Sequence, residues 1–113
     1  MDLYLELQNK IQQLELSIKS LRTNGTNYAN AEKDYKMLLR VECLKLRDEG
    51  MAITLIDKIC YGIPSVAEAR YKRDVAEAVY KANQEAINSL KLQMRLIENQ
   101  IGREYENTGK TSL

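Results

Sequence analysis

Residues that are apolar, apart from Asn83, recur at alternating spacings of three and four in two blocks near opposite ends of the chain. The positions are Tyr4, Leu7, Ile11, Leu14, Ile18 and Leu21 in the first block, and Ala76, Tyr80, Asn83, Ile87, Leu90, Met94, Ile97 and Ile101 in the second. Alternating gaps of three and four give the period that keeps one strip of a helix against a partner helix. The pattern therefore predicts two long helices with coiled-coil-like packing.

Helix starts and stops divide the chain into four expected helices. Asp2 can cap the first helix, and the run Asn24-Gly25-Thr26-Asn27 combines residues that favour a turn. Gly50 and the run Gly62-Ile63-Pro64 predict two further stops, because glycine suits a helix end and proline restricts the residue before it. We expect one domain over residues 1–106, with helices at about 2–23, 27–49, 52–61 and 65–105, followed by a flexible tail, 107–113.

The expected fold is all-α, a long antiparallel helical hairpin or coiled-coil-like bundle with a shorter helical insertion. The run from Ser65 to Glu68 has the sequence of a capping box, which favours a helix start at Ser65. The first helix can pack along Ile87 to Ile101, while the middle helices cover the first half of the last helix. A long hairpin has little core for its surface, so we expect a homo-oligomer. Asn83 either fixes the register of this packing or lies partly exposed at a gap in it.

The residues of enzymatic chemistry are largely missing. The chain has no histidine, which is the usual general base and the usual transition-metal ligand. Asp48 and Glu49 are neighbours on an expected helix and point apart, and Asp57 lies in a largely apolar segment without a second carboxylate. We therefore expect a protein that is not an enzyme, with no catalytic residues, no metal site and no cofactor.

Two further expectations concern the cellular compartment. Cys43 and Cys60 are the two cysteines of the chain, and each lies in an apolar helical context without a C-x-x-C partner. They are expected to be reduced thiols in the core. The sequence shows neither a signal-peptide pattern nor an apolar stretch of about 18 residues, so we expect a cytoplasmic protein without a membrane role.

Positive charge is concentrated in the middle of the chain, although the net charge is only +1. Arginine presents a planar fork to phosphate, and tyrosine offers a ring for stacking or for contact with a protein. The alternative is a solvated face that is held by pairs within a helix, such as Glu32 with Lys36. The candidate residues for ligand or partner binding are Lys33, Lys36, Arg40 and Arg47, then Arg70, Tyr71 and Arg73, together with Tyr28 and Tyr35.

Four short runs of the chain are similar to known sequences. They are Asp34-Tyr35-Lys36, Leu46-Arg47-Asp48-Glu49-Gly50-Met51, Arg73-Asp74-Val75-Ala76-Glu77 and Asn83-Gln84-Glu85-Ala86-Ile87-Asn88. With these runs the chain resembles small helical proteins encoded by phages and prophages of Gram-positive bacteria. The resemblance covers about residues 28–101 and carries no functional residues. It implies an accessory factor of early infection, such as an inhibitor of host defence or a helper of recombination or replication, in the bacterial host cytoplasm.

Three functions remain open from the sequence. The leading hypothesis is a non-enzymatic inhibitor of bacterial defence, which binds a host protein or sequesters a small phosphorylated nucleotide. The second is an accessory protein of phage recombination or replication that binds nucleic acid through the same basic residues. The third is a structural assembly factor that only self-associates.

Overall fold

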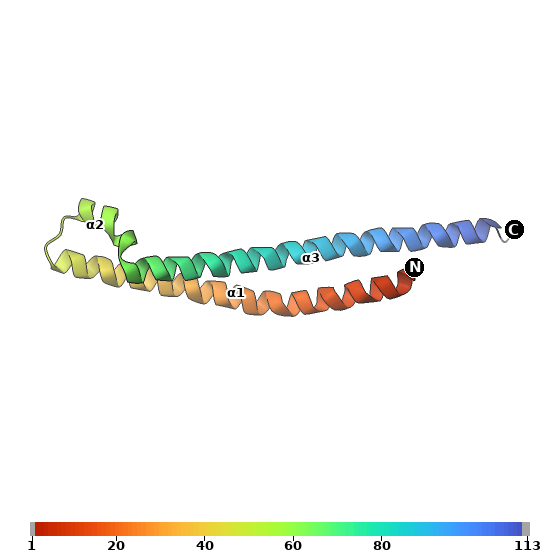
Figure 1. Cartoon of the computed structure of the whole chain (residues 1–113), viewed down its shortest axis with the longest axis horizontal. Coiled ribbons are helices and arrows are strands. Elements are labelled where there is room, and N and C mark those ends of the chain that lie inside the picture. The colour runs from red at the N-terminus through yellow and green to blue at the C-terminus, as the bar shows by residue number, and fades with distance from the viewer. Residues whose placement is uncertain (1, 112–113) are drawn as a thin grey trace. The chain divides into compact units, whose positions relative to one another are not determined.

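The computed structural model describes residues 2–111, and the exposure of side chains is described for residues 2–107. Its elements are α1 (Leu3–Asp48), α2 (Ile53–Ile59), the short 3-10 helix η1 (Cys60–Gly62) and α3 (Pro64–Thr111), as Figure 1 shows. None of residues 2–111 lies in a β-strand. The prediction of an all-α fold, with a long pair of helices and a short helical insertion, is confirmed.

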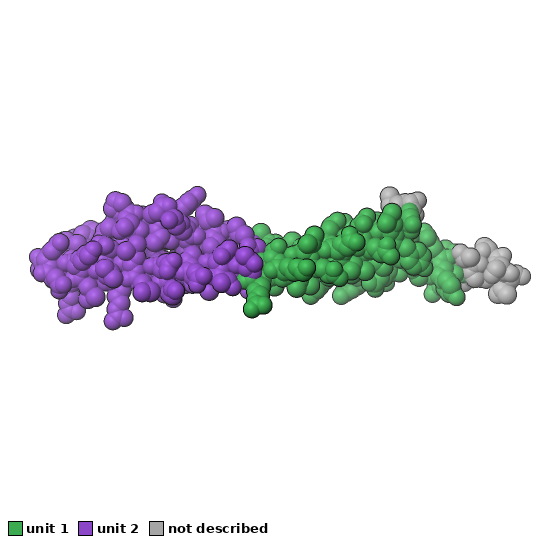
Figure 2. All heavy atoms as spheres, turned by 90° about the horizontal axis from the view of Figure 1, so that it is seen from below, with its two compact units in different colours: residues 1–22, 82–113 green, residues 23–81 purple. Residues whose placement is uncertain are grey.

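The chain forms two compact units (Figure 2). Unit 1 contains residues 1–22 and 82–113, and unit 2 contains residues 23–81. In each unit a segment of α1 lies beside a segment of α3 that runs in the opposite direction (Figure 1). Unit 2 also holds α2 and η1, which form the insertion between the long helices. The prediction of a single domain over residues 1–106 stays a prediction.

The expected break between residues 23 and 27 is wrong, because α1 continues through it as one helix. A single glycine in a helix costs only about 1 kcal/mol, which tertiary packing can outweigh. Gly25 does not have a positive φ, and a Cβ atom on it would lie 3.1 Å from Cε1 of Tyr80. Gly25 therefore serves close packing of the Tyr80 ring in unit 2 and does not end a helix.

The observed helix ends follow local chemistry that the sequence partly predicts. The Asp2 carboxylate accepts hydrogen bonds from the amides of Tyr4 and Leu5 at 3.0 and 3.2 Å, so the predicted cap is confirmed. Gly50 has a φ of 88°, which favours glycine, and it lies just beyond the end of α1. Its amide donates to the Arg47 carbonyl at 3.0 Å, and the next amide donates to the Leu46 carbonyl at 3.1 Å, which closes a Schellman motif.

The start and the end of α3 both differ from the prediction. The helix begins at Pro64, one residue before Ser65, so Ser65 already lies inside it and is not the N-cap. Proline suits the first helical position because its ring presets φ and its missing amide has no partner there anyway. At the other end α3 continues to Thr111, since Gly102 alone does not stop it. The expected tail over 107–113 is thus helical as far as Thr111, and residues 112–113 lie outside the described residues.

In unit 1 the predicted strip of α3 faces α1, whereas the predicted strip of α1 is only half right. Ile87, Leu90 and Ile97 are buried, and on α1 the leucine row (Leu7, Leu14, Leu21) is half-buried. The leucines alternate with half-buried Leu3, Lys10 and Ser17, and not with the exposed residues Tyr4, Ile11 and Ile18. The Asn83 amide donates to the Ser17 carbonyl at 2.9 Å, a close approach that the small serine permits. This polar contact joins the Ser17 row of α1 to α3, and a role of Asn83 in fixing the register stays a prediction.

Glycine-to-alanine changes test the packing role of Gly25. Gly102 has open space around it, so Gly102→Ala should raise the free energy of unfolding by about 0.5–1 kcal/mol through helix propensity. Gly25→Ala should not show this gain, because the new methyl group presses on the Tyr80 ring. Chemical denaturation followed by circular dichroism measures both effects. Equal stabilisation by the two changes would contradict the packing role.

Candidate functional site

The candidate residues from the sequence separate into groups with different surroundings in unit 2. Tyr28, Tyr35 and Arg73 belong to an internal cluster between α1 and α3. The four cations of α1 lie on the outside of that helix, and Arg70 and Tyr71 lie on exposed positions of α3. The structure therefore does not bring the predicted residues into one site.

Arg73 holds the internal cluster together. Its guanidinium lies 3.3 Å from a Glu32 carboxylate oxygen and 2.8 Å from one of Asp74, and it stacks 4.7 Å from the centre of the buried Tyr35 ring. The Arg73 side chain is only 19% exposed. Desolvation lowers the pKa of Arg73, but the hydrogen bonds that its guanidinium donates to Asp74 and Glu32, together with their negative charges, outweigh this effect and raise that pKa. Arg73 is thus engaged by three groups of unit 2 itself, two carboxylates and one ring.

Tyr28 is similarly engaged. Its ring centre lies 6.0 Å from that of Tyr80, with the two planes tilted by 34°. Its hydroxyl donates to the Glu77 carboxylate, and this bond is the main reason why the pKa of Tyr28 is raised. The pKa of Glu77 is lowered, first by Lys81, whose ammonium lies 2.7 Å away, and then by Tyr28. Ring and hydroxyl of Tyr28 therefore both have partners inside unit 2.

The basic row of α1 (Lys33, Lys36, Arg40, Arg47) has a different environment. All four side chains are exposed, and a helix turns about 100° per residue, which places them on the side away from the buried Tyr35. Lys36 lies 3.4 Å from Glu32. Lys33, Arg40 and Arg47 make no ion pair or hydrogen bond within the part of the chain that the structure describes. Three cations of the row are therefore available to a partner.

An apolar row that the sequence analysis missed runs beside these cations. Met37, Val41 and Leu44 are 61%, 47% and 48% exposed, and their spacing of four and three places them on one line along α1. By the rotation of a helix, this apolar row lies about 80° from the basic row. The spacing of the three residues in the sequence could have revealed it. We call the two rows together the outer face of α1.

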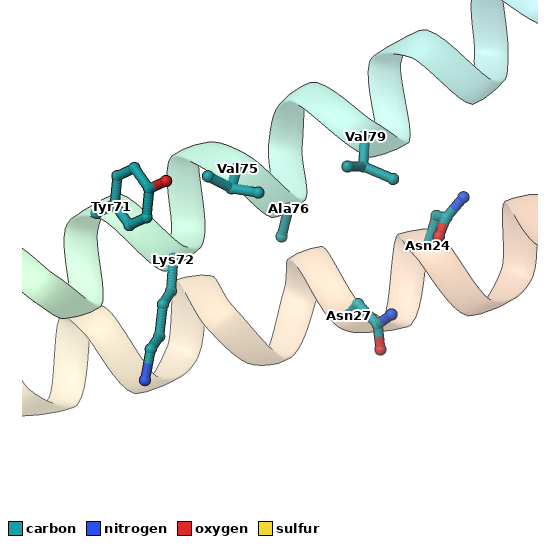
Figure 3. Close-up of a pocket in the computed structure, with 7 residues that line it drawn as sticks. All are labelled: Asn24, Asn27, Tyr71, Lys72, Val75, Ala76 and Val79. Carbon is teal, nitrogen blue, oxygen red and sulfur yellow. The ribbon is translucent and has the colours of Figure 1, made fainter.

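Arg70 and Tyr71 lie on α3. The Arg70 guanidinium lies 5.9 Å from the centre of the Tyr61 ring, which belongs to η1. Tyr71 borders a shallow hollow of about 270 Å³ between α1 and α3 (Figure 3). A second hollow, of about 380 Å³, shares Asn27 and Lys72 with the first and reaches Leu38 and Ser65. Amides and valines line the first hollow, whereas amides, alanines and the carboxylates of Asp34 and Glu68 line the second. None of the basic row of α1 lines either hollow.

Within residues 2–107 no three side chains of the cysteine, aspartate, glutamate and histidine types are grouped to hold a metal ion. Cys43 and Cys60 carry free thiols. The pKa of Cys43 is raised, mainly because burial desolvates its thiol and secondly because Cys60 lies nearby. Neither long helix, over its described length, contains an apolar stretch that could cross a membrane.

Comparison with known proteins adds no assignment to this geometry. No protein-family model, no curated protein and no solved structure matches the chain. The function must therefore be inferred from the described side chains, of which the outer face of α1 combines unpaired charge with exposed apolar surface.

Proposed function

We propose that this chain is a non-enzymatic binding protein and that the outer face of α1 docks on an acidic protein surface. The observation that carries the proposal is the pairing of two adjacent rows on one helix. Lys33, Arg40 and Arg47 have no partner among the described residues, and exposed Met37, Val41 and Leu44 lie beside them. Unpaired cations attract carboxylates and speed the encounter, while the apolar row supplies contact area that gains from leaving water.

The apolar row favours a protein over a nucleic acid as the partner. A phosphate backbone can pair with Lys33, Arg40 and Arg47, but it offers nothing apolar to Met37 or Leu44. Single strands also need exposed aromatic rings for stacking. Tyr28 and Tyr35 are engaged inside unit 2, and Tyr71 lies on the other long helix. The same engaged tyrosines disfavour the sequestration of a small phosphorylated nucleotide. Arg73 is also unsuited to bind its phosphate, because it already contacts Glu32, Asp74 and the Tyr35 ring.

The resemblance to phage proteins suggests the biological setting of this docking. In that setting the acidic partner is a protein of bacterial defence, and the chain inhibits it by covering a surface that the partner needs. The protein requires no catalytic residue for this role. Its action depends on occupancy, so binding strength and inhibition should change together in variants of the outer face.

Charge reversal provides the binding test. The probe is a synthetic helical peptide with a row of glutamates beside a row of leucines, and its affinity is measured by fluorescence anisotropy. Lys33→Glu, Arg40→Glu and Arg47→Glu together should weaken binding at least tenfold, because three attractive contacts become repulsive. The matched control reverses three other exposed cations, Lys19, Lys91 and Arg95, and changes the net charge equally. This control should stay within about threefold of the unmodified chain, on the expectation that rim charges act weakly.

Three outcomes would count against the proposal. Equal losses in the two triple variants would mean that only net charge matters. Tighter binding of a single-stranded oligonucleotide than of the peptide, with a steep dependence on salt, would favour the nucleic-acid hypothesis. For the biological setting, expression in a phage-restricting bacterium should raise plaque numbers, and the outer-face variant should not. Unchanged plaque numbers with the unmodified chain would contradict the defence assignment. The docking proposal would then still be judged by the peptide titration alone.

A further inference from the structure

A second apolar row lies uncovered on α1, in unit 1. The residues are Tyr4, Ile11 and Ile18, which are 66%, 37% and 50% exposed. Each is seven residues from the next. Such spacing keeps them on nearly one line along the helix. The leucine row (Leu7, Leu14, Leu21) lies next to them and is half-buried against α3. We call Tyr4, Ile11 and Ile18 the uncovered row.

The apolar surface of α1 is wider here than one neighbouring helix can cover. A helix pair buries two positions in seven, whereas helices of larger bundles show three. In unit 1 the leucine row and the row of Leu3, Lys10 and Ser17 face α3, and the uncovered row lies about 80° further around the helix. The uncovered row is apolar at all three of its residues, whereas the row of Leu3, Lys10 and Ser17, which faces α3, carries a lysine and a serine. A further helix is therefore expected beside α1.

We infer that the uncovered row of α1 packs against the same row of a second copy of this chain, in an antiparallel arrangement with its two-fold axis at Ile11. Equal spacing on both sides of Ile11 makes the row complementary to itself. Tyr4 of one copy then meets Ile18 of the other, and Ile11 meets its own equivalent. A two-fold interface requires this kind of self-complementarity, whereas a foreign partner does not.

Neighbouring polar groups fit the same arrangement. Gln8 and Glu15 are exposed and flank the uncovered row, one on each side of Ile11. The antiparallel pairing brings the Gln8 amide of each copy to the Glu15 carboxylate of the other, so a donor meets an acceptor twice. The Tyr4 rings lie at the outer ends of the contact, where the phenol hydroxyls stay in water. The new contact continues the existing one, because the leucine row borders both.

Sedimentation equilibrium of the full chain tests the interface. The unmodified chain should be a dimer, and Ile11→Glu should weaken its association at least 100-fold, because two carboxylates then meet at the axis. The control is Leu16→Glu, which places the same charge on another exposed apolar residue of α1, 64% exposed and on a different side of the helix. This control should remain a dimer. Circular dichroism checks that both variants keep their helical content.

A cross-linking measurement tests the register without placing a charge in the interface. In Ile11→Cys the two new thiols face each other across the axis, so mild oxidation with copper phenanthroline should give a covalent dimer, and Leu16→Cys should not. A monomeric unmodified chain, an oligomer larger than a dimer, or a dimer that survives Ile11→Glu would overturn the inference. A dimer in which Leu16→Cys cross-links instead of Ile11→Cys would overturn it equally. Peptide binding by the outer face lies in unit 2 and should persist in Ile11→Glu.

Discussion

Replacing Val66 with aspartate should destabilise unit 2 by about 4 kcal/mol or more, a large part of the free energy of unfolding of a small domain. Val66 has an exposed fraction of 0%. It lies in the first turn of α3, in the unit that also buries Tyr35, Ile56 and Cys60. A carboxylate at this position would lose its water without gaining a partner. The pKa of the new carboxyl group should rise, so the loss of stability should be smaller in acid.

Two matched variants separate the effect of charge from the effect of size. Val66→Ala should cost about 2 kcal/mol, since it removes buried methyl groups and leaves a small cavity. Val79→Asp makes the same chemical change on the same helix at an exposed position and should shift stability by only about 0.5 kcal/mol. Urea denaturation followed by circular dichroism measures all three. Similar midpoints for Val66→Asp and Val79→Asp would show that Val66 is not buried in solution.

Replacing Arg73 with alanine should lower the free energy of unfolding by about 2–3 kcal/mol. The change removes a partly desolvated stack on Tyr35, worth about 1–2 kcal/mol, and two ion pairs that add about 1 kcal/mol after screening. It also leaves the partly buried Glu32 carboxylate without its partner on α3. Arg73→Lys should recover only part of the loss, because an ammonium cannot bridge two carboxylates and stack at once.

The control for Arg73 is Arg40→Ala, which removes an exposed arginine without an ion pair in the described part of the chain. It should change stability by no more than about 0.5 kcal/mol. For peptide binding we expect the larger loss from Arg40→Ala and the smaller loss from Arg73→Ala, because Arg40 belongs to the outer face of α1 and Arg73 does not. Thermal denaturation together with the peptide titration gives both readouts. An Arg73→Ala variant with unchanged stability and lost binding would restore Arg73 to the ligand-binding site that the sequence suggested.

Much of the fold could be predicted because it depends on local patterns. The alternation of threes and fours predicted the long helices, and Asp2 and Gly50 end α1 as expected. The prediction of a turn at residues 24–27 was wrong for a physical reason. Asn and Gly weaken a helix only slightly, and the ring of Tyr80, 55 positions away by residue number, packs where a Gly25 side chain would be. A contact of that range has no local signature.

The candidate site was predictable only in part. Lys33, Arg40 and Arg47 are exposed cations, as the helical spacing suggested. Arg73 and Tyr35 carry equally suitable chemistry but contact each other between α1 and α3. Residue type and spacing cannot distinguish these cases, because an arginine that is free and one that is ion-paired look the same in sequence. The apolar row was overlooked since Met37, Val41 and Leu44 resemble core residues until their exposure is known.

The amino-acid sequence by itself determined that this chain is helical, where its short insertion lies and which residue types its surfaces can offer. Those properties follow from interactions between residues within one or two turns of each other. Only the tertiary structure decided that α1 runs unbroken and that Ser17 and not Ile18 faces α3. It also decided that Arg73 is held inside, while Arg40 has no partner among the described residues. Each of these depends on a neighbour from the opposite helix, and contacts of that kind outweigh local preferences of about 1 kcal/mol per residue.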